Sequence, residues 1–323
     1  MIKNILYNII CVPLYVFIKI KYRKESFSYK DTLYFLKRDI PSYFARKELN
    51  NSEWPNIKTL DYSKYKKSDT VFIVGSGTSI NDISEEQWKH INKHDIICLN
   101  QSFMNKNFKP TIAFLEFAKM KEIREIAYKN WKNDAIYQNI PQIFSYLNIK
   151  AHILDKEEFS NFEYLKDYYC QVPYFHSIPN KRILFDLIKF REKSKIFPLN
   201  NETLIHHLGS INKILNFCYL EGYKEIICLG LDMNNSRYFY EISEYDKVAN
   251  IQYLRDFVPN DKKDKNHGNA DPKNYKGGFV PGDEYIKEFN DLILKPKGIQ
   301  LFIGSKKAKL YPDLPYYFEK ENL

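Results

Sequence analysis

Short apolar runs recur along the chain, and helical patterns lie between them. The runs that predict buried strands are Val71–Val74, Asp95–Leu99, Thr111–Phe117, Glu225–Asp232 and Ile299–Ile303. Amphipathic or capped patterns predict helices at Ser84–Ile91, Lys119–Trp131, Thr203–Glu221 and Gly282–Leu294. Because strands that alternate with helices favour a parallel sheet, we expect an α/β fold with a mainly parallel, doubly wound, Rossmann-like sheet and helices on both of its faces.

Two helix ends carry specific signals. Ser84 and Gln87 have the spacing of a capping box, which predicts that a helix begins directly after Ser84. Gly222 follows a helical pattern at the position where a left-handed cap is favoured. These signals predict where one helix begins and where another ends.

The remaining stretches suggest how the chain is organised. We expect residues 1–25 to form a membrane-seeking helix, 26–68 to form a lead-in segment that packs on the domain, and 69–323 to form a single domain. Within that domain, residues 135–200 and 233–280 are polar or irregular, and they are predicted to be lid loops.

The first 25 residues contain an apolar stretch from Ile5 to Ile20, which basic residues close. The stretch is short for a membrane span and has no small-residue cleavage site, so a removed signal peptide is not expected. An interfacial helix on anionic lipid is the favoured interpretation. A short signal anchor and an ordinary helix packed on the domain are the alternatives.

The formal net charge is +9 and the pI is about 9.0. A basic surface attracts nucleic acid, anionic lipid or anionic substrates, and the charge alone does not choose between them. The sequence has no zinc-finger spacing, aromatic RNA-binding signature or basic heptad helix, so nucleic acid is not an expected partner. The five cysteines form no C-x-x-C pair, which is typical of buried free thiols in a reducing compartment and favours the cytoplasm.

A glycine-rich turn, Gly75-Ser76-Gly77-Thr78-Ser79, follows the first predicted strand. Glycines allow a tight turn and a close approach to a ligand, and a helix start offers free N–H groups to an anion. The turn lacks the third glycine of the dinucleotide fingerprint and the Gly-Lys-Ser/Thr of a P-loop. It is therefore either a phosphate cradle or a structural strand–helix turn.

Polar residues also follow the second predicted strand. Asn100 and Gln101 stand where ligands bind in an open parallel sheet, beyond the carboxyl ends of the strands. Their amides could recognise a base or a ribose, or could cap the loop.

A longer pattern extends from His206 to Tyr240. It comprises His206-His207-Leu208-Gly209-Ser210, a helix, Gly222-Tyr223-Lys224-Glu225-Ile226, and then Gly230-Leu231-Asp232 with Tyr238 and Tyr240. Together with the glycine turn and the Asn-Gln pair, this order resembles the bacterial sialyltransferases of glycosyltransferase family 42, over roughly residues 70–305. The resemblance implies a GT-A-like, Rossmann-type fold and an inverting, metal-independent transfer of a sialic-acid-like sugar from a CMP-sugar to a cell-surface glycan such as lipooligosaccharide or capsule.

The resemblance also implies roles for single residues. Gly75, Ser76, Gly77, Thr78 and Ser79 would hold the CMP phosphate and ribose. Asn100 and Gln101 would contact the nucleotide or the donor sugar, Ser210 would bond the cytidine end, and Asp232 would close the nucleotide pocket. Tyr240 falls where a family tyrosine donates to the leaving phosphate, which a fixed phenol stabilises as negative charge develops.

This sequence departs from the family at three positions. A second leaving-group tyrosine falls on Asn234, and Tyr238 is near enough to replace it. A family arginine falls on His207 and a family asparagine on Glu116. Because these differences concern the donor sugar more than the nucleotide, a related acidic sugar such as Kdo is an alternative.

His267 lies in the predicted loop 233–280. The family uses a histidine in this region as the general base, and an unperturbed imidazole has a pKa suited to that role. The resemblance thus implies that His267 is the catalytic base, with His176 and the pair His206-His207 as back-ups; a solvated histidine without a role is the alternative.

The favoured prediction is an enzyme that uses no cofactor beyond its CMP-sugar donor and no metal, at the cytoplasmic face of the inner membrane. Its expected partners are the donor, an oligosaccharide or glycolipid acceptor and the membrane surface, and self-association is left open. Two other classes compete with it: a phosphotransferase similar to pterin pyrophosphokinase, and a non-catalytic, membrane-associated assembly protein.

Overall fold

The computed structural model describes residues 61–115, 121–132, 134–145, 209–248, 251–256 and 280–320, with short pieces at 9, 11–13, 15–17, 19–20, 29, 33, 168–171, 174–175, 188–189, 204–206 and 263. Its centre is a seven-stranded sheet in the order β5-β4-β3-β2-β1-β8-β9, in which every pair is parallel. The strands are β1 (Thr70–Val74), β2 (Asp95–Leu99), β3 (Ile112–Leu115), β4 (Gln142–Ser145), β5 (Tyr168–Gln171), β8 (Glu225–Leu229) and β9 (Gln300–Ile303). A separate pair joins β6 (Tyr174–Phe175) to β7 (Ile205–His206).

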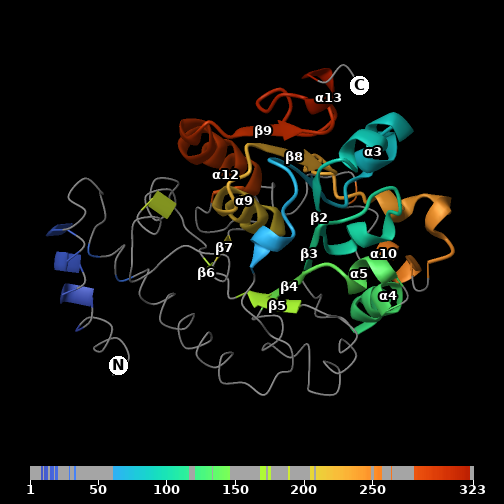
Figure 1. Ribbon diagram of the computed structural model, residues 1–323, viewed down its shortest axis with the longest axis horizontal. Coiled ribbons are helices and arrows are strands. Elements are labelled where there is room, and N and C mark those ends of the chain that lie inside the picture. The colour runs from blue at the N-terminus through green and yellow to red at the C-terminus, as the bar shows by residue number, and fades with distance from the viewer. Residues whose placement is uncertain are drawn as a thin grey trace.

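The strand order reverses at β1. The chain proceeds from β1 through β2 and β3 toward β5 on one side, and β8 then pairs with the other side of β1 (Figure 1). In an open parallel sheet, the crevice at such a reversal, beyond the carboxyl ends of the strands, is where ligands bind. The topology therefore points to the segments that follow β1, β2 and β8.

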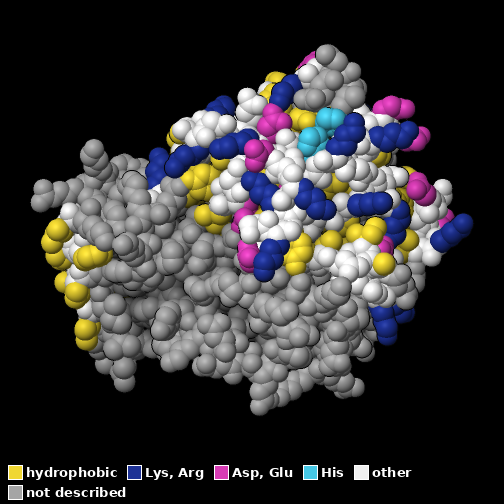
Figure 2. Space-filling view, viewed as in Figure 1, with side chains coloured by type: hydrophobic (Ala, Val, Ile, Leu, Met, Phe, Trp, Pro, Cys, Tyr) yellow, Lys and Arg dark blue, Asp and Glu magenta, His cyan; other side chains and the backbone are white. Residues whose placement is uncertain are grey.

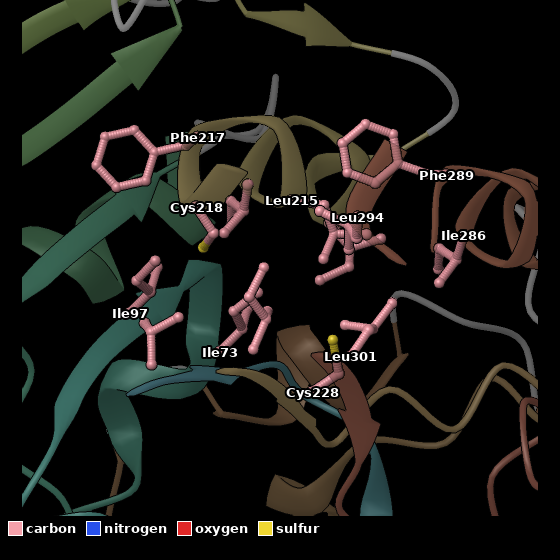
Figure 3. Close-up of a cluster of buried hydrophobic side chains, with 14 of the residues drawn as sticks. Ile73, Ile97, Leu215, Phe217, Cys218, Cys228, Ile286, Phe289, Leu294 and Leu301 are labelled. Atoms are coloured by element: carbon pink, nitrogen blue, oxygen red, sulfur yellow. The ribbon is translucent and has the colours of Figure 1, made fainter. Parts of the chain in front are cut away.

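Helices cover both faces of the sheet, as the sequence predicts. Val71 and Ile73 of β1 face a core that includes α9 (Ser210–Leu220) and α12 (Gly282–Phe289), part of which Figure 3 shows. Phe72 and Val74 face the opposite core. That core contains residues of α3 (Glu85–Ile91), α4 (Lys121–Lys132), α10 (Ile251–Asp256) and α13 (Tyr317–Lys320). Alternate side chains of each strand thus build two cores, which is the doubly wound arrangement.

Short elements complete the described chain. The 3-10 turns are η1 (Tyr62–Lys64), η2 (Thr78–Asp82), η3 (Asn100–Met104), η5 (Phe239–Glu241), η6 (Ser243–Tyr245) and η10 (Lys295–Lys297). α5 (Ala135–Gln138) is a single helical turn, and α12 continues as the π-helical segment η9 (Asn290–Leu294).

Several predicted boundaries are confirmed. β2 spans Asp95–Leu99, and Ser84 caps α3 through a full capping box with Gln87. Gly222 has φ +72°, the left-handed conformation expected at the end of α9. β8 ends at Leu229, before the predicted Asp232, because Gly230 has φ +63° and turns the chain.

Other expectations are corrected. The predicted helix from Thr203 begins only at Ser210, because Ile205–His206 forms β7 and Gly209, at φ +118°, separates the two elements. Residues 135–200, predicted as a lid, contain α5 and the sheet strands β4 and β5. The described part of 233–280 includes η5, η6 and α10.

The end of the lead-in packs on the domain through a buried carboxylate. Asp95, the first residue of β2, is fully buried and accepts hydrogen bonds from the backbone N–H groups of Lys67 (3.0 Å) and Ser68 (3.2 Å). The Tyr223 hydroxyl also donates to it (2.9 Å) and lies 2.7 Å from the Tyr62 hydroxyl. This network lies at the amino end of β2, away from the strand reversal crevice.

The described residues between Ile9 and Ile20 are helical and carry exposed apolar side chains, which Figure 2 shows as a row at one edge of the molecule. In the part of the chain that the structure describes, none of the helices has the length and apolar character needed to cross a membrane. Cys11, Cys98, Cys218 and Cys228 are buried free thiols, as the sequence predicts. Burial raises the pKa of Cys98 to about 11 and that of Cys228 to about 12.

Candidate functional site

A pocket opens at the strand reversal, and three segments following strands meet the start of α9 there. They contribute Gly75, Ser76 and Gly77 after β1, Leu99, Asn100 and Gln101 at the end of β2, Ser210 and Ile211 of α9, and Gly230, Leu231, Asp232, Met233, Asn235, Arg237 and Tyr238 after β8. The turn around Gly77 and the strand end at Asp232, 155 positions apart in sequence (232 − 77), therefore line one site.

The two glycines of the first turn allow it to pack against the turn after β8. Gly75 N–H donates to the Leu229 carbonyl (2.8 Å), and Gly77 N–H donates to the Gly230 carbonyl (2.9 Å). A Cβ at Gly75 would lie 2.7 Å from the Gly230 oxygen, and one at Gly77 would lie 2.6 Å from Asp232 Oδ2. The glycines are thus required by the contact between the two turns, whatever ligand the pocket takes.

Asp232 fastens the same turn with its side chain. Its Oδ2 accepts the Ser79 N–H (3.0 Å) and the Thr78 hydroxyl (3.2 Å), and its Oδ1 accepts the Ser79 hydroxyl. Asp232 is 6% exposed. Thr78 and Ser79, which the resemblance assigns to the CMP phosphate and ribose, are therefore engaged by Asp232 and lie outside the pocket lining.

Asn100 joins the end of β2 to the start of α9. It has φ +50°, and its side-chain Nδ2 lies 3.5 Å from the Ser210 hydroxyl. Gln101 lines the pocket beside it. The predicted amide pair and the predicted serine thus meet at one side of the pocket, although they lie on different elements.

The two candidate tyrosines are placed differently. Tyr238 lines the pocket and forms a bridge with Gly77, and the next N–H, of Phe239, donates to the Ser76 carbonyl (3.0 Å). Tyr240 stacks under Tyr238, with ring centroids 5.1 Å apart and planes inclined by 7°, and it is only 3% exposed. Burial raises the pKa of both phenols, so both are neutral near pH 7.

Asn234 turns away from the pocket. Its backbone N–H donates to the Asp232 carbonyl (2.8 Å), and its side chain donates to the Lys307 carbonyl (2.7 Å) in the loop after β9. This asparagine therefore holds two loops together instead of facing a ligand. Glu116, His207 and His267 lie outside the described residues, as does the back-up His176.

Sequence reasoning missed several lining residues: Leu99, Ile211, Leu231, Met233, Asn235 and Arg237. Asn235 and Arg237 lie in sequence between Asp232 and Tyr238, both of which are predicted site residues. The whole segment from 232 to 238 could therefore have been predicted to line the site. Met233 has φ +59°, which the sequence does not reveal.

The lining is mixed: apolar side chains such as Leu99, Ile211 and Met233 lie beside polar ones, and two side chains are charged, Asp232 and Arg237. Among the residues that the structure describes, His, Cys, Asp and Glu side chains form no group of three or more suited to a metal ion. Backbone N–H groups, amides, hydroxyls and one guanidinium are what the described lining offers to a ligand.

No protein-family model and no curated protein matches the chain. The chain is similar to two solved sialyltransferase structures. One is the monofunctional alpha-2,3-sialyltransferase Cst-I from Campylobacter jejuni, with 15% identity, a TM-score of 0.43, and coverage of 80% of this chain and 84% of that one. The other is the sialyltransferase CST-II in complex with a trisaccharide acceptor and CMP, with 16% identity, a TM-score of 0.37, and coverage of 76% and 85%. At these identities and TM-scores, the two likenesses assign neither a family nor a substrate to the chain.

Proposed function

We propose that this chain is a glycosyltransferase that moves a sialic-acid-like sugar from a CMP-sugar to a cell-surface saccharide. One observation supports the proposal above the others. Gly77, Asn100, Ser210 and Asp232, which the family resemblance assigns to one nucleotide site, come from four separate segments and line one pocket at the strand reversal.

The chemistry needs a donor aimed at the leaving phosphate. As the bond from the anomeric carbon to the phosphate oxygen breaks, its electron pair moves to CMP, and a neutral phenol in the pocket stabilises the growing charge. Tyr238, which lines the pocket, takes this role in place of the buried Tyr240. His267 is the proposed base that removes the proton from the acceptor hydroxyl as it attacks with inversion.

Calorimetry with CMP, UMP, GMP and ATP tests the nucleotide assignment. Binding of CMP without added metal, more tightly than the other nucleotides, is the expected result. Preference for ATP with magnesium would overturn the proposal in favour of phosphoryl transfer. Transfer assays with CMP-sialic acid and CMP-Kdo then separate the two donor sugars.

The base is tested by His267→Ala and, separately, by His176→Ala, which removes a back-up candidate. The expected result for His267→Ala is a loss of transfer by at least about 100-fold with unchanged CMP affinity, because general-base catalysis contributes on the order of 10²–10⁴-fold. Normal turnover of His267→Ala would show that another group is the base.

We further propose that the protein works at the cytoplasmic face of an anionic membrane. The helical residues near the N-terminus expose Ile9 (63%), Val12 (52%), Val16 (48%), Phe17 (39%) and Ile20 (65%). Ile9, Val12, Val16 and Ile20 recur every three or four residues, as on one face of a helix, and Phe17 adjoins Val16. The basic residues Lys19, Lys21, Arg23 and Lys24 lie at the end of this stretch. An apolar face bordered by basic residues suits an anionic lipid surface and an acceptor attached to lipid.

Sedimentation with phosphatidylglycerol vesicles, compared with phosphatidylcholine vesicles, tests this surface. The double variant Val12→Ser/Val16→Ser should bind the anionic vesicles more weakly. Its matched control is Ile242→Ser/Leu292→Ser, which removes two exposed apolar side chains elsewhere. Equal binding by all three proteins would reject the N-terminal helix as the membrane contact.

A further inference from the structure

Arg237 is the only cation among the described residues that line the pocket, and the sequence pattern assigned it no role. It directly precedes Tyr238, so two consecutive residues, an arginine and a tyrosine, line the pocket. The side chain of Arg237 is 45% exposed, which places it between the pocket and solvent.

Glu241, which pairs with Arg237, is shared with other donors. Arg237 Nη1 lies 3.5 Å from Glu241 Oε2, and Lys263 Nζ lies 3.5 Å from the same oxygen. The other oxygen of Glu241 accepts the Tyr238 N–H (2.9 Å). The separation of 3.5 Å between Arg237 Nη1 and Glu241 Oε2 exceeds the roughly 2.7–2.9 Å of a strong charge-assisted hydrogen bond.

Asp232, the one acidic residue in the described lining, uses its carboxylate for hydrogen bonds within the protein. Both oxygens of Asp232 accept hydrogen bonds from Thr78 and Ser79 of the first turn. Lys307 lies close enough for the charge of Asp232 to contribute to its raised pKa, behind the larger effect of its hydrogen bond to Asp82. The carboxylate of Asp232 is thus engaged by the first turn, which leaves Arg237 as the charged side chain of the described lining that can meet an anion.

We propose that Arg237 and the Tyr238 hydroxyl form the phosphate subsite of the pocket, and that Arg237 selects a nucleoside monophosphate over the corresponding nucleoside. This inference rests on the proposed function and adds the group that meets the anion. A guanidinium matches a phosphate because its planar donors can engage two oxygens at once.

The subsite also affects the transfer step. The donor carries a phosphodiester with one negative charge. When the anomeric C–O bond breaks, the electron pair remains on the phosphate oxygen, the acceptor oxygen bonds to the anomeric carbon, and the acceptor proton leaves to the base. The released monoester carries close to two negative charges near pH 7. A cation beside the phosphate therefore stabilises the leaving group more than the bound donor, which lowers the barrier.

Calorimetry of CMP and of cytidine with the full chain tests the subsite. Arg237→Gln should weaken CMP binding by about tenfold to 100-fold, the usual range for a hydrogen bond to a charged group, and change cytidine binding by less than about twofold. Arg237→Lys should restore part of the CMP affinity, because it returns the charge without the planar donors. The matched control is Lys307→Gln, which removes a positive charge near Asp232 but outside the lining and should leave CMP binding within about twofold.

The outcomes separate this inference from the proposed function. If the wild type binds CMP and Arg237→Gln loses CMP and cytidine to the same extent, or loses neither, the phosphate subsite is wrong and the nucleotide pocket stands. If Lys307→Gln loses as much CMP affinity as Arg237→Gln, the affinity depends on the overall positive charge of this region, and the phosphate subsite is again wrong. A wild type that binds no nucleotide overturns both proposals. Thermal unfolding of each variant shows whether the fold is intact.

Discussion

Ser79 and Asp232 are 153 residues apart in sequence, and two hydrogen bonds join them across the reversal point of the sheet. Both donors, the N–H and the hydroxyl of Ser79, are directed at one buried carboxylate. The turn after β1 and the end of β8 are therefore fixed to each other before any ligand arrives. A pocket built on that junction is preorganised, which reduces the entropic cost of binding.

Asp232→Asn should destabilise the protein and weaken nucleotide binding together. An amide at this position presents N–H donors where Thr78 and Ser79 also donate, so at least one buried donor loses its acceptor. We expect a loss of about 1–3 kcal/mol in the free energy of unfolding, measured by urea titration, since that is the usual cost of a buried unsatisfied group.

Asp82→Asn is the matched control for this change. Asp82 pairs with Lys307 at 2.8 Å, but both side chains are more than half exposed (53% and 76%). The same substitution there should cost clearly less stability than Asp232→Asn, because an exposed ion pair contributes little. Equal losses at positions 82 and 232 would contradict a special role for the buried junction.

Gly77→Ala should separate the two turns. Gly77 has φ −70°, an ordinary value, so the methyl group acts only through its contacts, which would lie 2.6 Å from Asp232 Oδ2 and 2.8 Å from the Gly230 oxygen. We expect a loss of about 1–3 kcal/mol in stability, the usual cost of overpacking, together with weaker CMP binding in calorimetry.

Gly222→Ala provides the contrasting case. Gly222 has φ +72° and no atom within 4 Å of a built Cβ, so the alanine there meets backbone strain without a clash. It should cost about 1 kcal/mol in the free energy of unfolding and leave CMP affinity unchanged. Unaltered CMP binding by Gly77→Ala would show that the pocket does not depend on contact between the turns.

The parts of the fold that follow from local pattern could be predicted from the sequence. Val71–Val74 and Asp95–Leu99 are apolar runs, and Ser84 and Gln87 have capping-box spacing; each signal lies within a few residues. The strand β5, Tyr-Tyr-Cys-Gln, lacks such an apolar run. It joins the sheet through pairing with β4, which the local sequence does not reveal. Local pattern carries little information on such long-range pairing.

The sequence predicted where the site residues lie better than it predicted what each of their side chains contacts. The residues of the glycine turn, the Asn-Gln pair and Asp232 do meet, because parallel topology brings the ends of their strands to one edge. The hydrogen bonds from Thr78 and Ser79 to Asp232, a partner far along the chain, are not visible in the sequence. Only three-dimensional contact shows that Arg237 lines the pocket and that Tyr240 does not.

Stability should fall as the pH rises above about 10. Burial raises the pKa of Tyr245 to about 12 and raises the pKa values of Tyr238 and Tyr240 above their usual value. Unfolded tyrosines titrate near pH 10, so above that pH the unfolded chain loses protons that the folded chain retains. The stabilisation is fully present below about pH 10 and decreases by up to about 1.4 kcal/mol per pH unit for each such tyrosine.

Urea unfolding between about pH 8 and pH 11, with tyrosinate absorbance followed in parallel, measures this dependence. Absorbance should rise together with unfolding for the buried phenols. If a full set of tyrosines ionises in protein that remains folded near pH 10, the burial of these rings would not be the cause.

Tyr238→Phe and Tyr240→Phe form a matched pair that tests which phenol meets the leaving group. The rings stack on each other, and each variant removes one oxygen, but only Tyr238 lines the pocket, whereas Tyr240 is 3% exposed. Loss of a donor aimed at developing charge costs on the order of 10²–10³ in kcat, so we expect Tyr238→Phe to slow transfer to that extent with little change in KM. Tyr240→Phe should remain within a few-fold of the wild type. The reverse order would assign the leaving phosphate to Tyr240 and would require the η5 turn to open when substrate binds.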